Sequence, residues 1–131
     1  MAVIKIVDDD KEFALIIAEI LKKEGHSVLI QHSTEHVIAT LIEDKPDLLI
    51  LDVMFPENPV GGFELARKIR QKKATCKIPI ILLTSINQEF PMDFSSDDVD
   101  ATWMPVQDFL EKPVKPAKLL KAVNKLLKTK K

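Results

Sequence analysis

The stretch Leu48-Leu49-Ile50-Leu51-Asp52 (LLILD, residues 48–52) holds four consecutive apolar residues and ends in a carboxylate. An uninterrupted apolar run of this kind is typical of a parallel strand that helices cover on both faces. A strand with one face in water would alternate apolar and polar residues instead. The run therefore predicts a central strand of a parallel sheet, with Asp52 at its carboxyl end.

Similar short apolar runs lie on both sides of this strand, separated by amphipathic segments. We expect further strands at residues 2–7, 27–31, 78–83 and 108–111. Apolar residues also recur at helical spacing in four groups: Phe13, Ile16, Ile17, Ile20 and Leu21; Val37, Ile38, Leu41 and Ile42; Phe63, Ala66 and Ile69; and Leu119, Leu120, Val123, Leu126 and Leu127. Because strands alternate with helices, the sequence predicts an α/β fold of βαβ units around a parallel sheet.

Capping residues and a glycine mark the expected ends of the first two helices. The alternative to a functional role for the acids after the first strand is that Asp8 or Asp10 merely caps the first helix through a side-chain oxygen. Gly25 stands where that helix should end. Ser33 or Thr34 is expected to cap the second helix in the same way.

The segment Ser85–Gln107 does not fit a regular helix. It contains Pro91 and Pro105 together with paired serines and paired aspartates, which are poor helix formers. We therefore expect a short or irregular fourth helix. The segment is also acidic, since no Lys or Arg occurs between Lys77 and Lys112.

Length and composition indicate one globular domain, and we expect residues 1–131 to fold as a single unit. The chain has 19 basic and 20 acidic side chains and a net charge of −1, so no positive field attracts nucleic acid or an anionic membrane. Cys76 is the only cysteine, which excludes an internal disulfide and a thiolate zinc cluster. The sequence shows no signal peptide and no apolar run long enough to span a bilayer, and the predicted location is the cytoplasm.

Polar residues stand at the carboxyl ends of four predicted strands. They are Asp8, Asp9, Asp52, Thr84 and Lys112. In parallel α/β sheets ligands bind beyond this edge, so one site can gather all five side chains. Adjacent carboxylates repel one another unless a cation lies among them, and carboxylate oxygens with water are the usual ligands of Mg²⁺. The pattern predicts a magnesium site.

Asp52 has the neighbours that a phosphoryl acceptor requires. A carboxylate can accept a phosphoryl group covalently, provided that charge is neutralised and the groups are aligned. Mg²⁺ can bridge Asp52 and the incoming group, while the Lys112 ammonium and the Thr84 hydroxyl can contact its other oxygens.

These motifs resemble those of the receiver domains of two-component response regulators, over essentially the whole chain. Ile-Val-Asp-Asp-Asp (6–10) is similar to the family's acidic pair, and Leu-Asp-Val-Met-Phe-Pro (51–56) to its phosphorylation strand. Thr84-Ser85 resembles the switch hydroxyl and its small neighbour, Phe109 stands at the aromatic switch position, and Lys112-Pro113 resembles the family's Lys-Pro pair. Five motifs in the expected order make the resemblance specific.

The resemblance implies a fold and a metal site. The fold is a flavodoxin-like (βα)5 domain, a doubly wound parallel five-stranded sheet of order 2-1-3-4-5; that order is taken from a known member of the family rather than worked out from the residues. The metal, Mg²⁺ or alternatively Mn²⁺, would be held by Asp9 directly, by Asp8 largely through water, by Asp52 and by the Met54 backbone carbonyl.

The resemblance also implies roles and partners. Asp52 would accept the phosphoryl group with the help of Thr84 and Lys112, and Thr84 and Phe109 would switch the conformation. The donor would be a sensor histidine kinase or a histidine phosphotransfer protein. An unidentified downstream protein would bind the surface formed by the fourth helix, the fifth strand and the last helix. We expect a monomer or a phosphorylation-dependent dimer, without nucleic-acid or membrane contact and without turnover of an external substrate.

Met54 and Ile86 occupy the two positions that commonly tune phosphoaspartate hydrolysis in this family. Apolar side chains there cannot orient an attacking water by hydrogen bonding, which predicts slow self-dephosphorylation.

Two other functions are alternatives to a phosphoacceptor switch. One is a degenerate receiver that serves as an unphosphorylated docking module, which the unusual segment 85–107 suggests. The other is an aspartyl phosphatase of the dehalogenase type, but that chemistry needs a second Asp where this chain has Met54. His32 and His36 are four residues apart, as metal ligands on a helix can be, but we expect solvated histidines because the predicted cap lies between them. The lysines after residue 114 fit a solvated helix face.

Overall fold

The computed structural model describes residues 2–33, 35–52, 61–85, 108–112 and 114–129. The elements are β1 (Val3–Val7), α1 (Lys11–Lys23), β2 (Ser27–Gln31), α2 (Val37–Asp44), β3 (Leu48–Asp52), α3 (Gly61–Gln71), β4 (Ile80–Ser85), β5 (Asp108–Lys112) and α4 (Pro116–Thr129). Strands and helices alternate from β1 to β4 as the sequence predicted, and α4 follows β5. The expected fourth helix falls in residues 86–107, outside the described residues, as do Met54 and Ile86.

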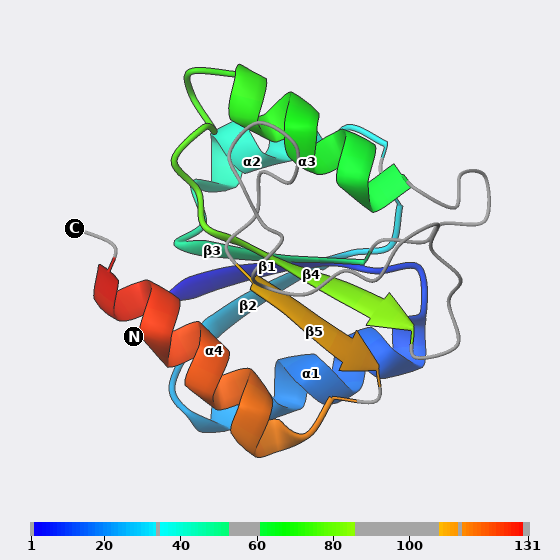
Figure 1. The fold of residues 1–131 in the computed structure, drawn as a ribbon, viewed down its shortest axis with the longest axis vertical. Helices are drawn as coiled ribbons and strands as arrows, with labels where there is room; N and C mark the ends of the chain where they lie inside the picture. Colours follow the sequence, from blue (N-terminus) through cyan, green and yellow to red (C-terminus); the bar gives the residue numbers. More distant parts are fainter. Residues whose placement is uncertain (1, 34, 53–60, 86–107, 113, 130–131) are drawn as a thin grey trace.

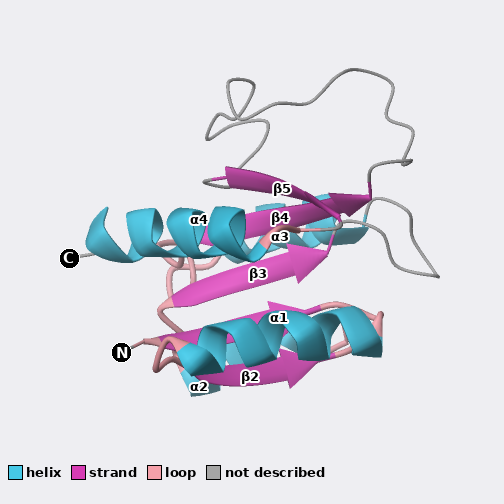
Figure 2. Ribbon diagram, turned by 90° about the horizontal axis from the view of Figure 1, so that it is seen from below, coloured by secondary structure: helices cyan, strands magenta, loops and turns pink. Residues whose placement is uncertain are grey.

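The five strands form one parallel sheet of order β2-β1-β3-β4-β5, which confirms the predicted flavodoxin-like topology (Figure 1). All arrowheads point to the same edge of the sheet (Figure 2). Helices α1 and α4 cover one face, and α2 and α3 cover the other. None of the helices in the described part of the chain is long and apolar enough to cross a membrane.

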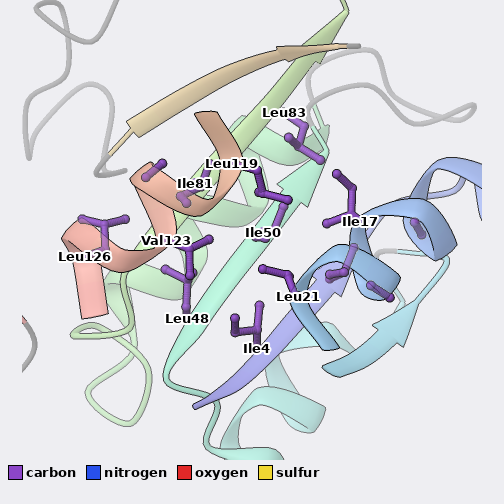
Figure 3. Close-up of a cluster of buried hydrophobic side chains, with 14 residues drawn as sticks. Ile4, Ile17, Leu21, Leu48, Ile50, Ile81, Leu83, Leu119, Val123 and Leu126 are labelled. Atoms are coloured by element: carbon purple, nitrogen blue, oxygen red, sulfur yellow. The ribbon is translucent and has the colours of Figure 1, made fainter. Parts of the chain in front are cut away.

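Alternate strand residues supply two separate hydrophobic clusters. One cluster joins the strands to α1 and α4 (Figure 3), through Ile4, Ile6, Leu48, Ile50, Ile81 and Leu83. The other joins them to α2 and α3, through Val7, Leu49, Leu51, Ile80 and Leu82. Each fully buried Leu or Ile stabilises the fold by about 1.5–3 kcal/mol. Strands β1, β3 and β4, which end at the predicted site, are therefore packed on both faces.

Helix α1 begins and ends where the sequence predicted. The Asp10 side chain accepts a hydrogen bond from the Phe13 backbone N–H at 3.1 Å, which caps the first turn. Gly25 follows the helix with φ 89°, a left-handed conformation that glycine adopts without a Cβ clash. The predicted apolar stripe was wrong at Ile16, which is 58% exposed beside Leu15 at 55%.

Helix α2 does not start as predicted. We expected Ser33 or Thr34 as the cap, but the N-cap is His36, in a left-handed conformation with φ 61° and without a side-chain cap hydrogen bond. The preceding loop is organised by Gln31, whose side-chain amide donates to the backbone carbonyls of Ser33 at 3.3 Å and Glu35 at 2.6 Å. With these bonds the chain turns around the Gln31 side chain, and the helix begins only at Val37.

Strand β4 begins two residues later than the expected Ile78, because Ile78 belongs to the turn before it. The Ile78 backbone N–H donates to the Thr75 carbonyl at 3.1 Å. Arg70 from α3 holds the same turn by donating to the carbonyls of Cys76 and Ile78. Burial lowers the pKa of the Arg70 guanidinium. The strand extends to Ser85, so Thr84 is part of it.

Candidate functional site

The sheet register brings the predicted site positions to one edge. Val7 is paired with Leu51, so Asp8, the next residue, stands level with Asp52. Asp52 is paired with Leu83, the residue before Thr84. Strands β4 and β5 pair Ser85 with Lys112. The backbone thus places all five predicted positions at the carboxyl edge of neighbouring strands.

Three of these residues bring their carboxylates together. Asp8, Asp9 and Asp52 each offer one oxygen, and these oxygens lie within 4.8 Å of one another. Asp8 is 0% exposed and Asp52 is 5% exposed, whereas Asp9 reaches solvent. Two buried anions and one accessible anion in such a small volume create a strongly negative site.

Backbone contacts hold Asp8 in this cluster. Its N–H donates to the Gln31 carbonyl at 3.0 Å, which continues the pairing of β1 with β2 beyond the strands. Its carbonyl accepts a hydrogen bond from His32 Nδ1 at 3.1 Å. Its Oδ1 accepts a hydrogen bond from the Asp10 N–H at 2.9 Å. The side chain therefore projects from a backbone that is fixed on both sides.

The donor set fits a hard divalent cation. Like charges this close destabilise one another, and the cost grows where burial removes water. A cation among them reverses the sign of the interaction, and carboxylate oxygens are the ligands that Mg²⁺ prefers. Asp9 offers access from solvent, where metal-bound waters can complete the coordination. Asp8, Asp9 and Asp52 can thus hold the predicted ion.

For Thr84, Phe109 and Lys112 the structure gives the position of each residue in its strand. Thr84 is the penultimate residue of β4, Phe109 the second residue of β5, and Lys112 its last residue. Thr84 and Lys112 are at the same edge as the carboxylate cluster. Met54, whose carbonyl was predicted as a metal ligand, lies outside the described residues.

His32 is a neighbour of the site that the sequence prediction did not include. We expected His32 and His36 to be solvated, and both side chains are exposed. His32 nevertheless contacts the backbone of Asp8. The available signal was its position directly after β2, which is the sheet neighbour of β1.

Comparison with known proteins agrees with this architecture. A family model of the response regulator receiver domain matches residues 4–124. The chain belongs to this family. Receiver domains are signalling modules of two-component systems rather than turnover enzymes, they interact with histidine kinases or phosphotransfer partners, and they generally use Mg²⁺ at an acidic pocket.

Relatives of two lengths match the chain. Protein PilH of Pseudomonas aeruginosa is 32% identical, over 97% of this chain and 98% of PilH. The transcriptional regulatory protein CpxR of Klebsiella pneumoniae is 34% identical over 95% of this chain, which corresponds to 49% of CpxR. The chain therefore spans about half the length of CpxR and nearly the full length of PilH.

Solved structures share the fold. A putative response regulator from Chloroflexus aurantiacus superposes with a TM-score of 0.78 at 28% identity, covering 97% of this chain and 98% of that one. The chemotaxis protein CheY4 of Vibrio cholerae gives a TM-score of 0.78 at 24% identity, covering 96% of this chain and 98% of that one. The second similarity supports the fold alone.

Proposed function

We propose that this chain is the phosphoacceptor switch of a two-component phosphorelay, in which Asp52 takes a phosphoryl group from a phosphohistidine. The donor is a sensor histidine kinase or a histidine phosphotransfer protein. The observation that carries the proposal is the gathering of Asp8, Asp9 and Asp52, with ligand oxygens within 4.8 Å of one another at the carboxyl edge of the sheet. Membership of the receiver family supports the same chemistry.

The reaction exchanges one bond for another at phosphorus. An oxygen of the Asp52 carboxylate forms the new P–O bond while the P–N bond of the donor breaks. The electron pair of that bond stays on the imidazole nitrogen, which is left ready to take up a proton. Asp52 is 5% exposed at the end of β3, and in this proposal the donor reaches it from the carboxyl edge of the sheet.

The residues around Asp52 divide the remaining tasks. Asp8 and Asp9, together with Asp52, would hold Mg²⁺, which when bound supplies positive charge against the phosphoryl oxygens. In this proposal Lys112 places an ammonium at one oxygen, and Thr84 donates a hydroxyl hydrogen bond to another. The movement of Thr84 and Phe109 then changes the partner surface that includes β5 and α4.

Intact-mass measurement with a small phosphodonor tests the proposal. Incubation with acetyl phosphate and Mg²⁺ should add a single phosphate, and both EDTA and the Asp52→Asn substitution should abolish the addition. Asp47→Asn is the matched control, because Asp47 lies at the opposite edge of the sheet, where its carboxylate accepts from the Val3 N–H at 2.9 Å. This variant should still be phosphorylated.

The decay of the phosphorylated form provides a second readout. The apolar Met54 and Ile86 predict that the phosphate persists well beyond seconds in the presence of Mg²⁺, and a lifetime of seconds contradicts slow hydrolysis. If the wild-type chain takes up no phosphate, the phosphoacceptor proposal is wrong and the unphosphorylated docking module becomes the better account.

A further inference from the structure

We infer that His32 is a positioning residue for Asp8. By binding the Asp8 backbone, it holds the Asp8 carboxylate in the orientation that a divalent cation requires. The inference rests on the proposed function, because it concerns the same metal site. His32 is outside the carboxylate cluster and acts through Asp8 rather than on a ligand.

The contact between His32 and Asp8 has a defined polarity. His32 Nδ1 lies 3.1 Å from the Asp8 carbonyl oxygen, and since a carbonyl oxygen can only accept, the hydrogen bond forms in the tautomer that carries the hydrogen on Nδ1. The preceding residue, Gln31, accepts the Asp8 N–H at 3.0 Å through its own carbonyl. Two consecutive residues at the end of β2 therefore bind the two peptide groups that flank the Asp8 side chain.

The loop that carries His32 is itself anchored. The Gln31 side chain donates to the carbonyls of Ser33 and Glu35, and its Oε1 lies 3.0 Å from the Thr40 hydroxyl of α2. The Thr40 hydroxyl also accepts from Lys5 Nζ at 3.3 Å. Polar contacts thus run from the middle of β1, through α2, to the end of β2.

Lys5 anchors these polar contacts in the middle of β1. Its side chain is 6% exposed and forms an ion pair of 2.9 Å with Asp44 at the end of α2. A buried ammonium held by a carboxylate and a hydroxyl has little freedom to rearrange. The His32 ring therefore projects toward Asp8 from a loop that is tied to the core of the sheet.

Fixing Asp8 matters because metal affinity depends on ligand orientation. Hydrogen bonds that orient metal ligands typically change affinity by about 10–100-fold when they are removed. His32 is exposed and binds the backbone of Asp8 rather than its carboxylate, so we expect an effect at or below the low end of this range. The bond from the Asp10 N–H to Asp8 Oδ1 does not involve His32, so we expect His32 variants to retain it and the fold of the turn.

Titration calorimetry with MgCl₂ on the full chain tests the inference through three variants. His32→Ala removes the donor and should weaken Mg²⁺ binding about three- to tenfold. His32→Asn places an amide N–H where Nδ1 lies and should restore most of the affinity. His26→Ala is the control, since His26 Nδ1 also bonds the backbone of a residue that adjoins β1, here as the acceptor of the Ala2 N–H at 3.2 Å, at the opposite end of β2. This control should leave Mg²⁺ affinity unchanged, whatever it does to the thermal midpoint in EDTA.

The outcomes separate the inference from the function on which it rests. Wild-type Mg²⁺ affinity in His32→Ala, or an equal loss in His26→Ala, overturns the positioning role and leaves the phosphoacceptor proposal intact. If His32→Asn fails to recover affinity, the hydrogen bond to Asp8 is not the cause of the loss and the inference is wrong. If the wild-type chain binds no Mg²⁺, the inference and the proposed metal site both fail.

Discussion

The two edges of the sheet use the same types of side chain in opposite ways. At the amino edge, the Asp47 carboxylate accepts from the Val3 N–H at 2.9 Å, and His26 Nδ1 accepts from the Ala2 N–H at 3.2 Å. At the carboxyl edge, Asp8, Asp9 and Asp52 bring their oxygens within 4.8 Å of one another. At the first edge a carboxylate and an imidazole each accept from a backbone N–H, whereas at the second edge three carboxylates lie close together. The first arrangement stabilises the sheet, whereas the second is one that a bound cation would stabilise.

Adding Mg²⁺ should therefore separate variants at the two edges most clearly, by its effect on the free energy of unfolding. At a free concentration of about 100 times Kd, an ion that binds only the folded chain raises the free energy of unfolding by about 2.7 kcal/mol. Chemical denaturation with MgCl₂ or with EDTA measures this increment. Asp9→Asn should remove most of it, and Asp47→Asn should retain it. An equal increment in all three proteins would mean that Mg²⁺ binds elsewhere.

The same substitution at the two edges should change stability in opposite directions without metal. Asp8→Asn removes one of three crowded charges and keeps an oxygen for the Asp10 N–H, so it should raise the free energy of unfolding in EDTA by about 1–2 kcal/mol. Asp47→Asn converts a charged acceptor into a neutral one and should lower it by about 1 kcal/mol. Denaturant midpoints of both variants, measured side by side, give the signs. Destabilisation by Asp8→Asn would show that repulsion does not dominate the carboxyl edge.

Lys5 lies in the middle of β1, between the two edges, and its ion pair with Asp44 should contribute less to stability. Lys5→Met keeps the length of the side chain but removes the ion pair with Asp44. We expect a loss of about 1 kcal/mol, well below the cost of breaking a fully buried pair, because the Asp44 side chain is 30% exposed and can be hydrated. The double variant Lys5→Met, Asp44→Asn should recover part of this loss. Absence of any coupling between the two substitutions in a double-mutant cycle would show that the pair contributes nothing.

The sheet could be predicted because its signal is local. Each central strand is an apolar run that ends in a polar residue, and side chains of alternate parity must enter opposite layers. The carboxylate cluster followed from topology, since parallel strands bring their carboxyl ends together. Asp10 and Gly25 marked the ends of α1 because capping depends on neighbouring residues alone.

The start of α2 could not be predicted from local sequence. Ser33 is a good capping residue, but its carbonyl is bound by the Gln31 side chain, which is in turn held by Thr40. A contact from beyond the loop therefore overrides the capping preference. The partners of Lys5 were hidden for the same reason, as Asp44 is 39 residues away. Ile16 was misassigned because helical spacing does not indicate how wide the buried face is.

The hydrogen bond from the Asp10 N–H to Asp8 Oδ1 links the acidic cluster to the first turn of α1, which the Asp10 side chain itself caps. A cation bound to Asp8 would draw electron density from the carboxylate and would weaken it as the acceptor of this amide hydrogen bond. The Asp10 backbone resonance is therefore a natural reporter of ion occupancy in nuclear magnetic resonance. It lets the chain's own backbone register the ion without an attached label.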